Sequence, residues 1–400
     1  MREMKDSGIE WVGAIPNHWR VSKIKQIVRW KSVKGQPDLP VLSLYRDYGV
    51  IPKDSRDDNH NVTSLDTSGY KVVEHGDLVI NKMKAWQGSL AVSEYNGIVS
   101  PAYHICKITS ENICKKYLHY LLRDASYLPE YMRLSTGLRV GQWDLSFDDF
   151  KNIPFLVPPL AEQERIAAFL DAECAEIDAV LEKTRASIEE YKKLKQAVVT
   201  QAVTKGIRGD RPMKNSGIEW IGDIPAEWDY TKAKNCVNIQ NGSDPKTEGS
   251  IPVYGSGASS FKTCGEYKEG PSVLIGRKGA TLHIPHYIST KFWNVDTAFN
   301  VYAKPNFDLK FYFYCACSFD YRFYISQTTL PSMTQTAYEN MFLPLPSNDE
   351  QQAIASYLDN RCEEIDALIW KKQECLVEIE NYKKSLIYEY VTGKKEVHSL

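Results

Sequence analysis

The stretch VPPLAEQERIAAFLDAECAEIDAVL (Val157–Leu181) decides the fold, because it returns 188 positions later as LPSNDEQQAIASYLDNRCEEIDALI (Leu345–Ile369). In each copy a proline precedes acidic residues, and a long run without proline or glycine follows. Acidic side chains favour the first turn of an α-helix, and proline is tolerated only near its start. Each copy therefore predicts a long helix.

Both helical stretches carry a heptad pattern. Spacings of four and three residues alternate from Ile177 to Ala202 and from Ile354 to Tyr390, apart from occasional lysines, which is typical of a coiled-coil seam. About 45 residues at ~1.5 Å each would form a rod of roughly 65 Å, whereas helices in globular domains average about 11 or 12 residues. We therefore expect the two helices to pair with each other, antiparallel, rather than each to lie on its own domain.

A second repeat, which we call the tag, precedes each helix at a different spacing. SGIEWVGAIPNHW (Ser7–Trp19) returns as SGIEWIGDIPAEW (Ser216–Trp228), and 11 of the 16 positions from Met4 to Trp19 are identical at an offset of 209. The order tag, variable region, helix thus occurs twice, and the second variable region is 21 residues shorter. Such internal repetition decides an architecture before local structure does. We expect the flanks to share one role and the diverged middles to have separate ones.

The sequence therefore predicts an α+β protein with a pseudo-twofold internal repeat. Two mixed α/β domains would lie at opposite ends of a long antiparallel two-helix coiled coil. The expected boundaries are 1–157 for the first domain, 158–206 for the first helix, 207–345 for the second domain, 346–393 for the second helix and 394–400 for a C-terminal tail.

Composition excludes several classes of protein. A net charge of -2, with 43% hydrophobic and 25% charged residues, is that of an ordinary globular protein without a bulk attraction to DNA or lipid. The N-terminus lacks an apolar signal core, and no apolar run is long enough to cross a bilayer, so we expect a cytoplasmic protein. The nine cysteines contain no CxxC pair, so we expect neither a disulfide framework nor a metal site.

No motif in the sequence points to catalysis. The chain has no GxxxxGK[ST] loop, GxSxG elbow, HExxH helix or GxGxxG turn, each of which places reactive groups or phosphates in a defined geometry. We therefore expect no catalytic residue in this chain.

Basic and amide side chains occur at corresponding places in the two variable regions. An apolar stretch is followed by a basic residue in DLVINKMKAWQG (Asp77–Gly88) and again in SVLIGRKGATLH (Ser272–His283). Lysine and arginine can bind phosphates or the O6/N7 edge of guanine, and glutamine suits adenine; a solvated surface role remains open for each residue singly. The candidate DNA-binding residues are Lys82, Lys84, Gln87, Arg139, Gln142, Arg277, Lys278, Thr334 and Gln335.

The repeated motifs resemble those of the specificity subunit of type I restriction-modification systems. The matching features are IPxxW (Ile15–Trp19 and Ile224–Trp228), a proline before Glu162-Gln163 and before Glu350-Gln351, and the continuations IAAFLD and IASYLD. Both motifs occur twice in the same order, and the resemblance covers essentially the whole chain.

This resemblance implies a non-catalytic DNA-binding subunit. In the family, each of two target-recognition domains reads one half of an asymmetric, interrupted DNA site, and the paired helices fix the gap. The helices dock two modification subunits, which methylate adenine with S-adenosylmethionine. Two restriction subunits can join for ATP- and magnesium-dependent cleavage. The chain itself would bind no cofactor, and its partners would be double-stranded DNA and these subunits.

The two tags are nearly identical, which argues against their reading two different half-sites. We assign them, with the acidic starts of the helices, to a structural or partner-docking role. The residues concerned are Trp11, Pro16, Trp19, Trp220, Pro225, Trp228, Glu162, Gln163, Glu350 and Gln351.

Two questions stay open from the sequence. A non-catalytic coiled-coil scaffold with two protein-binding adaptor domains would also explain the rod and the near-neutral charge. In addition, NYKKSL in the second helix aligns with EYKKLK in the first only after a three-residue shift, so the equality of the helices, and with it the spacing of any bipartite site, is not determined.

Overall fold

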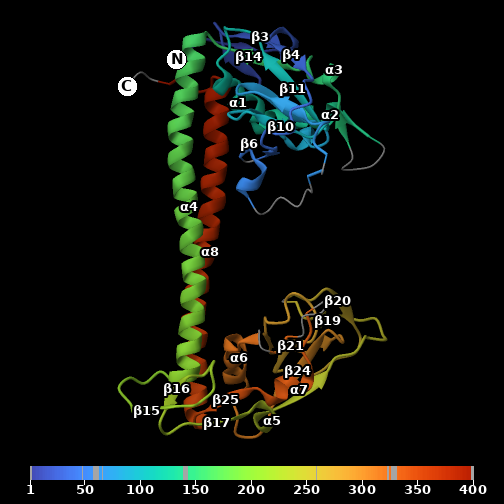
Figure 1. Ribbon diagram of the computed structural model, residues 1–400. Helices are drawn as coiled ribbons and strands as arrows, with labels where there is room; N and C mark the ends of the chain where they lie inside the picture. Colours follow the sequence, from blue (N-terminus) through green and yellow to red (C-terminus); the bar gives the residue numbers. More distant parts are fainter. Residues whose placement is uncertain are drawn as a thin grey trace. The chain divides into compact units, whose positions relative to one another are not determined.

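The structure is a computed structural model (Figure 1), and it describes residues 2–46, 48–56, 63–64, 66–137, 143–257, 259–321, 324–325 and 331–397. The chain divides into two compact units. Unit 1 comprises Met1–Lys183 with Cys375–Leu400, and unit 2 comprises Thr184–Glu374. Each unit contains one tag and one variable region, together with part of each long helix.

The two long helices are α4 (Leu160–Lys205, 46 residues) and α8 (Asn348–Val391, 44 residues). Two residues separate each helix from the strand before it, and the first of these residues is a proline, Pro158 or Pro346. Gly206 follows α4 with φ of 75°, and Gly393 follows α8 with φ of 72°. This left-handed backbone, which glycine adopts without strain, is a common way to end a helix.

The helices have equivalent lengths between equivalent contacts. Thr204 and Thr392 are buried at the ends of the two helices, and each hydroxyl donates to the carbonyl four residues before it. Thr204 follows Glu162 by 42 positions, as Thr392 follows Glu350. The three-residue shift of the YKK motif is therefore a change of sequence within the helix and not a change in its length.

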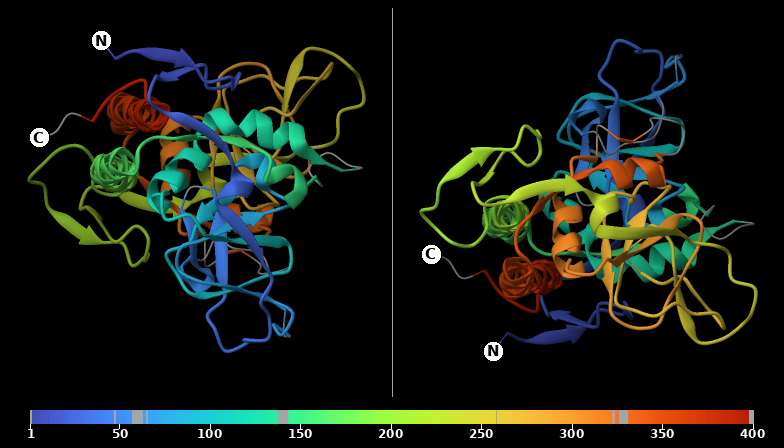
Figure 2. Two further views of the ribbon diagram at one scale, coloured as in Figure 1. Left: turned by 90° about the horizontal axis from the view of Figure 1, so that it is seen from above. Right: turned by 90° about the horizontal axis from the view of Figure 1, so that it is seen from below.

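Within each unit the helices run antiparallel, side by side (Figures 1 and 2). In unit 1, Lys383 Nζ lies 2.6 Å from Asp178 Oδ1, and the Phe169 and Tyr390 rings are 4.5 Å apart. Rising numbers on α4 thus face falling numbers on α8.

The same pairing occurs in unit 2. Lys195 Nζ lies 2.6 Å from Asp366 Oδ2, and Lys372 Nζ lies 5.6 Å from the centroid of the Tyr191 ring. The lysines that interrupt the heptad pattern therefore bind the opposite helix. The expected antiparallel pairing of the long helices is confirmed within each unit.

Each unit has a four-stranded antiparallel sheet at the centre of its variable region. The strand order is β4-β11-β8-β9 in unit 1 and β18-β24-β21-β22 in unit 2. The strands are β4 (Val28–Lys31), β8 (Asp77–Asn81), β9 (Leu90–Val92), β11 (Tyr103–Ile108), β18 (Val237–Asn241), β21 (Ser272–Gly276), β22 (His286–Ile288) and β24 (Ala298–Ala303).

The strand registers of the two sheets correspond residue by residue. Asn81 pairs with Tyr103 as Gly276 pairs with Ala298, and every residue of the pair is displaced by 195 positions. The two middles are therefore versions of one fold, and the mixed helix-and-sheet class with an internal repeat is confirmed.

Short helices and strands complete the two units. The short helices are α1 (Lys115–Arg123), α2 (Leu128–Leu134), α3 (Phe147–Phe150), α5 (Ala233–Cys236), α6 (Leu309–Ser318) and α7 (Gln335–Asn340). The remaining strands of unit 1 are β1 (Met4–Asp6), β2 (Ala14–Pro16), β3 (Arg20–Lys23), β5 (Leu42–Tyr45), β6 (Gly49–Pro52), β7 (Lys71–Val73), β10 (Gly97–Val99), β12 (Ser135–Thr136), β13 (Asp144–Leu145) and β14 (Pro154–Val157). Those of unit 2 are β15 (Met213–Asn215), β16 (Asp223–Pro225), β17 (Asp229–Lys232), β19 (Ile251–Tyr254), β20 (Lys262–Cys264), β23 (Trp293–Asn294) and β25 (Phe342–Leu345).

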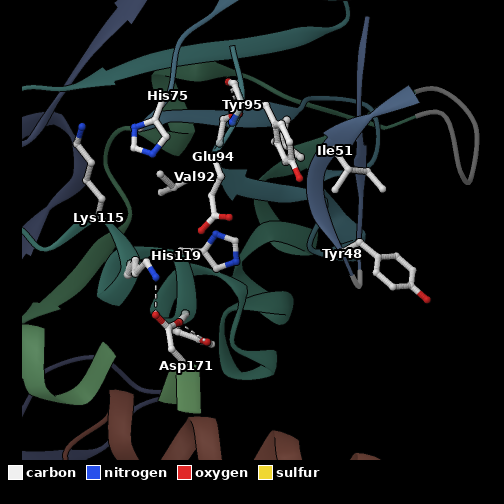
Figure 3. Close-up of a pocket in the computed structure, with 14 residues that line it drawn as sticks. Tyr48, Ile51, His75, Val92, Glu94, Tyr95, Lys115, His119 and Asp171 are labelled. Carbon is white, nitrogen blue, oxygen red and sulfur yellow. Dashed lines mark hydrogen bonds and ion pairs between the residues drawn. The ribbon is translucent and has the colours of Figure 1, made fainter. Parts of the chain in front are cut away.

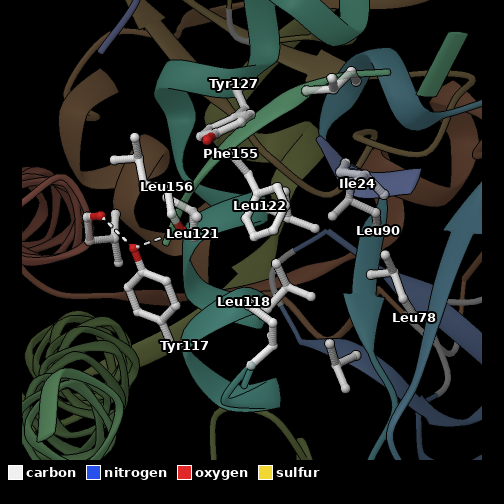
Figure 4. Packing of buried hydrophobic residues seen from close by; sticks show 14 of the residues in the cluster. Ile24, Leu78, Leu90, Tyr117, Leu118, Leu121, Leu122, Tyr127, Phe155 and Leu156 are labelled. Carbon is white, nitrogen blue, oxygen red and sulfur yellow. Dashed lines mark hydrogen bonds between the residues drawn. The ribbon is translucent and has the colours of Figure 1, made fainter. Parts of the chain in front are cut away.

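Helix α1 joins the sheet of unit 1 to the long helices. Its buried face, which includes Leu118 and Leu122, packs among residues of β8, β9 and β14 (Figure 4). The buried Tyr117 hydroxyl donates to the carbonyl of Val391 at 3.1 Å, at the end of α8. The variable region and the end of α8 therefore share one apolar core.

In the part of the chain that the structure describes, α4 and α8 are too polar, and the other helices too short, to cross a membrane.

Candidate nucleic-acid interface

The turn that follows β8 is fixed to the neighbouring segments of unit 1. The backbone N–H of Lys82 donates to the carbonyl of Ala102 at 3.2 Å, and its carbonyl accepts from Leu145 N at 2.9 Å. The Lys82 ammonium lies 2.8 Å from Asp144 Oδ2, and the side chain is one-third exposed (33%). Two backbone hydrogen bonds and an ion pair therefore hold this basic residue in one place at the end of the strand.

The rest of the turn carries exposed polar side chains on either side of a tryptophan that packs against a second tryptophan. Lys84 and Gln87 are exposed. Between them, the Trp86 ring meets the Trp143 ring edge-on at 5.3 Å, and Trp86 Nε1 donates to the carbonyl of Met83 at 3.2 Å. This aromatic contact restricts the turn while leaving both candidate side chains accessible.

Several ammonium groups of unit 1 raise the local positive potential near this turn. The buried Lys71 donates from Nζ to the carbonyl of Tyr103 at 2.5 Å. Burial lowers the pKa of Lys71, and repulsion from Lys34 and Lys82 lowers it further. Like charges close enough to repel each other attract anions such as the phosphates of a nucleic acid.

The corresponding turn after β21 in unit 2 has the same backbone geometry. Arg277 N donates to Thr297 O at 2.8 Å, and Arg277 O accepts from Met333 N at 2.9 Å. Lys278 Nζ lies 3.7 Å from Asp296 Oδ2. Arg277 therefore occupies the place of Lys82, in both cases at the junction of a strand end with the segment before a short helix.

Thr334 and Gln335 lie next to this turn, at the start of α7. The Thr334 hydroxyl accepts from Ala337 N at 3.1 Å and so caps the helix. The Gln335 amide donates to the carbonyl of Ile239 at 3.1 Å and accepts from Asn241 Nδ2 at 3.3 Å. Both side chains are thus engaged within the domain, and a direct role in base contact stays a prediction.

The structure brings the candidate DNA-binding residues of each unit into one region. In unit 1 these are Lys82, Lys84 and Gln87, and in unit 2 they are Arg277, Lys278, Thr334 and Gln335. Arg139 and Gln142 lie outside the described residues.

The tag of unit 1 binds the start of α4. The Arg2 guanidinium and His18 Nε2 both contact the buried Glu162 carboxylate, His18 at 2.8 Å. The Arg2 guanidinium also lies 5.9 Å from the ring centroid of Trp19, which is fully buried. Burial would raise the pKa of Glu162, but the hydrogen bonds from Arg2 and His18 outweigh it and hold the pKa below its ordinary value.

Unit 2 repeats this arrangement at the start of α8. Arg211 Nη1 lies 2.7 Å from Glu350 Oε1, and Trp228 Nε1 donates to Glu350 Oε2 at 2.8 Å. The Arg211 guanidinium lies 4.9 Å from the centroid of the Trp228 ring. Arg2 and Arg211 are separated by the tag offset of 209, which is the signal that could have identified them from the sequence.

The other tag tryptophans pack on the variable regions. The Trp11 ring lies 6.0 Å from Tyr127, and the Trp220 ring lies 5.2 Å from Phe319, both edge-on. Pro16 and Pro225 end the second strand of each tag hairpin and are buried. Each tag therefore joins its variable region to the ends of the long helices.

The glutamine beside each buried glutamate binds the backbone directly before a helix of the variable region, α1 in unit 1 and α6 in unit 2. Gln163 Oε1 accepts from Cys114 N at 2.9 Å, and Gln351 Oε1 accepts from Asp308 N at 2.8 Å. Each amide also donates to the carbonyl of a proline, Pro158 at 2.8 Å and Pro346 at 2.9 Å.

A further pair of contacts, absent from the sequence-based candidates, lies two turns farther along. Lys116 Nζ and Tyr120 OH bind Asp171 of α4 at 2.6 and 2.8 Å. In unit 2, Lys310 and Tyr314 bind Asp359 of α8 in the same way. These aspartates are the final residues of IAAFLD and IASYLD, so their repetition was visible, whereas their partners come from the diverged regions.

The chain matches one protein family over most of its length. Residues 16–190 and 225–376 match the family described as "Type I restriction modification DNA specificity domain". The two matches contain the two variable regions and large parts of both long helices.

Similar proteins agree with this match. The type I restriction enzyme MjaVIII specificity subunit of Methanocaldococcus jannaschii is 24% identical over 424 residues, which cover 96% of this chain and 95% of that protein. A chain from a structure on "complex assembly" and "conformational transition of the type I R-M system" has a TM-score of 0.74 at 16% identity, covering 95% of this chain and 99% of its own. The HsdS subunit from Thermoanaerobacter tengcongensis gives 0.51 at 16% identity, covering 95% and 98%. Both solved structures share the fold.

Proposed function

The chain belongs to the type I restriction modification DNA specificity family, and on that premise we propose that it recognises a bipartite, asymmetric DNA sequence. The recognition would direct the modification and restriction subunits of a type I complex to that site. Membership of this family favours DNA recognition over the alternative of a coiled-coil scaffold that binds only proteins.

The observation that carries this proposal is the repeated basic turn. Lys82 and Arg277 occupy corresponding positions at strand ends, each held by the same two backbone hydrogen bonds. The residues around them differ between the two units, since Lys84 and Gln87 have no identical counterparts. Positioned cations bind the phosphate backbone in any sequence, whereas differing neighbours allow each unit to read different bases.

The long helices offer surfaces for partner subunits. Trp370 and Val377 of α8 are 57% and 58% exposed, and large exposed apolar side chains favour protein contacts. We infer two modification subunits, one for each repeat, and two restriction subunits in the complete complex. The modification subunits would bind S-adenosylmethionine and the restriction subunits ATP and magnesium, in the cytoplasm, so that this chain supplies recognition and no catalysis.

The test is to co-express the chain with its modification subunit and to map N6-methyladenine across the host genome. We expect methylation at an interrupted motif with two different halves. Lys82→Ala and Lys84→Ala together should relax or abolish the half read by unit 1, and Arg277→Ala with Lys278→Ala should affect only the other half.

Matched controls come from the opposite end of the edge strands. Lys25 and Lys234 are exposed, occupy the same position in the two repeats, and lie away from the basic turns. Lys25→Ala and Lys234→Ala should leave the motif unchanged. Methylation that does not change when this chain is deleted would refute the proposal. A motif whose two halves both change when only one unit is altered would refute it as well.

A further inference from the structure

Unit 1 contains a cavity of about 330 Å³ next to α1 (Figure 3). Its lining includes Tyr48, Ile51 and Tyr95 on one side, His75 and Lys115 on the other, and Val92. Pockets that bind small ligands have volumes of about 300–1,000 Å³ and combine apolar walls with a few polar groups. The cavity is large enough for a single ring.

The second repeat identifies what occupies the same place in unit 2. Leu78 pairs with Val92 across β8 and β9, as Val273 pairs with Tyr287 across β21 and β22. Tyr287 therefore corresponds to Val92, and it carries an aromatic ring where unit 1 has only an isopropyl group.

The facing helices correspond as well. Lys116 and Lys310 each bind the equivalent aspartate of a long helix. His119 of α1 therefore corresponds to Phe313 of α6, because each lies three positions after its lysine. In unit 2 the Tyr287 and Phe313 rings lie 6.1 Å apart, edge-on. The positions of Val92 and His119, which line the cavity in unit 1, thus carry in unit 2 a tyrosine ring packed against a phenylalanine ring.

A cation lies over that ring. Lys310 Nζ is 5.5 Å from the centroid of Tyr287, within the range of a cation–π contact. Lys116 holds the corresponding position in unit 1, tied to Asp171 at 2.6 Å. Unit 1 therefore keeps the lysine that faces the ring although its own strand supplies no ring.

We propose that the cavity of unit 1 binds a neutral aromatic ring of phenol size, contributed by a ligand in place of the missing tyrosine. The ring would pack on Val92 and Ile51, face the Lys116 ammonium and lie edge-on to His119. Its source would be either a free small phenol or a tyrosine side chain of a partner subunit, because both present the same chemistry.

The charges of the lining favour a neutral ligand over an anion. Lys115 and Lys116 are balanced by Glu94 and Asp171. Burial, and then repulsion from Arg123, lowers the pKa of His119 to about 3, so its imidazole is uncharged at neutral pH.

The experiment uses the full-length chain and p-cresol, the side-chain analogue of tyrosine, titrated by calorimetry and by saturation-transfer NMR. We expect one saturable site for p-cresol and much weaker binding of 4-methylcyclohexanol, which has a similar shape but no π face. Equal binding of the two probes, or no saturable binding by the unmodified chain, would overturn the proposal.

Two variants exchange the features of the repeats. Val92→Tyr combined with His119→Phe copies unit 2 into unit 1 and should abolish p-cresol binding while circular dichroism stays unchanged. Tyr287→Val opens the equivalent volume in unit 2 and should raise the stoichiometry to two. If the double variant does not fold, Tyr287→Val decides, because a stoichiometry that stays at one contradicts the assignment.

A final arm identifies the source of the ring. The titration is repeated on the chain in complex with its modification subunit. Loss of p-cresol binding indicates a ring supplied by that subunit, and retained binding indicates a free small molecule; both results support the site.

Discussion

Trp228 and Glu350 are joined by a 2.8 Å hydrogen bond from the indole Nε1 to the carboxylate, across 122 positions of sequence. Both side chains are buried, and Arg211 completes the contact at 2.7 Å. The second tag, for which the sequence predicts a structural or partner-docking role, is thus bound to the start of a long helix.

Removal of the Glu350 carboxylate should destabilise unit 2. Glu350→Ala removes the buried carboxylate that the Trp228 indole and the Arg211 guanidinium share, and the loss of one partner of a buried pair costs about 3–5 kcal/mol. Urea unfolding, followed by tryptophan fluorescence, would measure the change. Glu227→Ala is the control, because Glu227 contacts the same arginine at 3.0 Å from an exposed position, and its midpoint should stay within error of the parent.

Gly393 should tolerate no side chain. A Cβ there would lie 2.5 Å from Pro16 Cδ, and φ is 72°. We expect Gly393→Ala to lower the stability of unit 1 by about 2–4 kcal/mol, the sum of backbone strain and overpacking. Gly217 has nearly the same φ, 71°, with no atom within 4 Å of its Cβ, so Gly217→Ala reports the strain alone. Equal losses of stability in the two variants would show that Pro16 of the first tag does not pack closely against Gly393 after α8.

Unit 1 should be acid-labile because of His119. The pKa of this histidine is about 3 in the folded chain, lowered first by burial, against about 6.5 in an unfolded chain. On acidification the unfolded chain therefore takes up the proton first, and the contribution to stability falls between pH 6.5 and 3, by at most about 1.4 kcal/mol per pH unit. His119→Phe, the residue of the second repeat, should flatten this part of the stability–pH curve. Parallel curves for parent and variant would contradict the assigned pKa.

DNA affinity should fall steeply as the salt concentration rises. Removal of one lysine that binds a phosphate should reduce the slope of log K against log salt by about one. Neutralised phosphates release counterions, so Lys82→Ala should reduce the slope of log K against log salt by about 1. Gln87→Ala removes no charge and should leave the slope unchanged while altering sequence preference. Fluorescence anisotropy of the assembled complex on a duplex carrying the mapped motif measures both, and an unchanged slope for Lys82→Ala would exclude a phosphate contact.

The elements that repeat were the elements that could be predicted. The heptads and the proline-free runs predicted α4 and α8, and the paired motifs predicted two copies of one fold. The apolar stretches at Asp77 and Ser272 became β8 and β21 because their side chains form the centre of each sheet.

What could not be predicted depends on contacts between distant segments. Lys116 and Tyr120 look like ordinary polar positions of a short amphipathic helix until Asp171, about 50 residues away, is placed beside them. Gln335 is a candidate for base contact because its amide has a donor and an acceptor, and only the folded domain shows that this amide also binds Ile239 and Asn241; its contact with a base stays a prediction. The cavity beside Val92 could not be predicted from the sequence, because a valine in place of a tyrosine forms no recognisable motif.

Each tag is bound by the start of one long helix and by the end of the other. The first tag contacts Glu162 of α4 and the segment after α8, where Lys394 Nζ donates to Val12 O at 3.1 Å. The second tag contacts Glu350 of α8, and Arg211, which precedes this tag, donates to the carbonyl of Lys205 at the end of α4 at 3.0 Å. Within each unit, a tag thus connects the start of one long helix to the end of the other. A substitution that releases a tag should therefore loosen two helix ends of its unit at the same time.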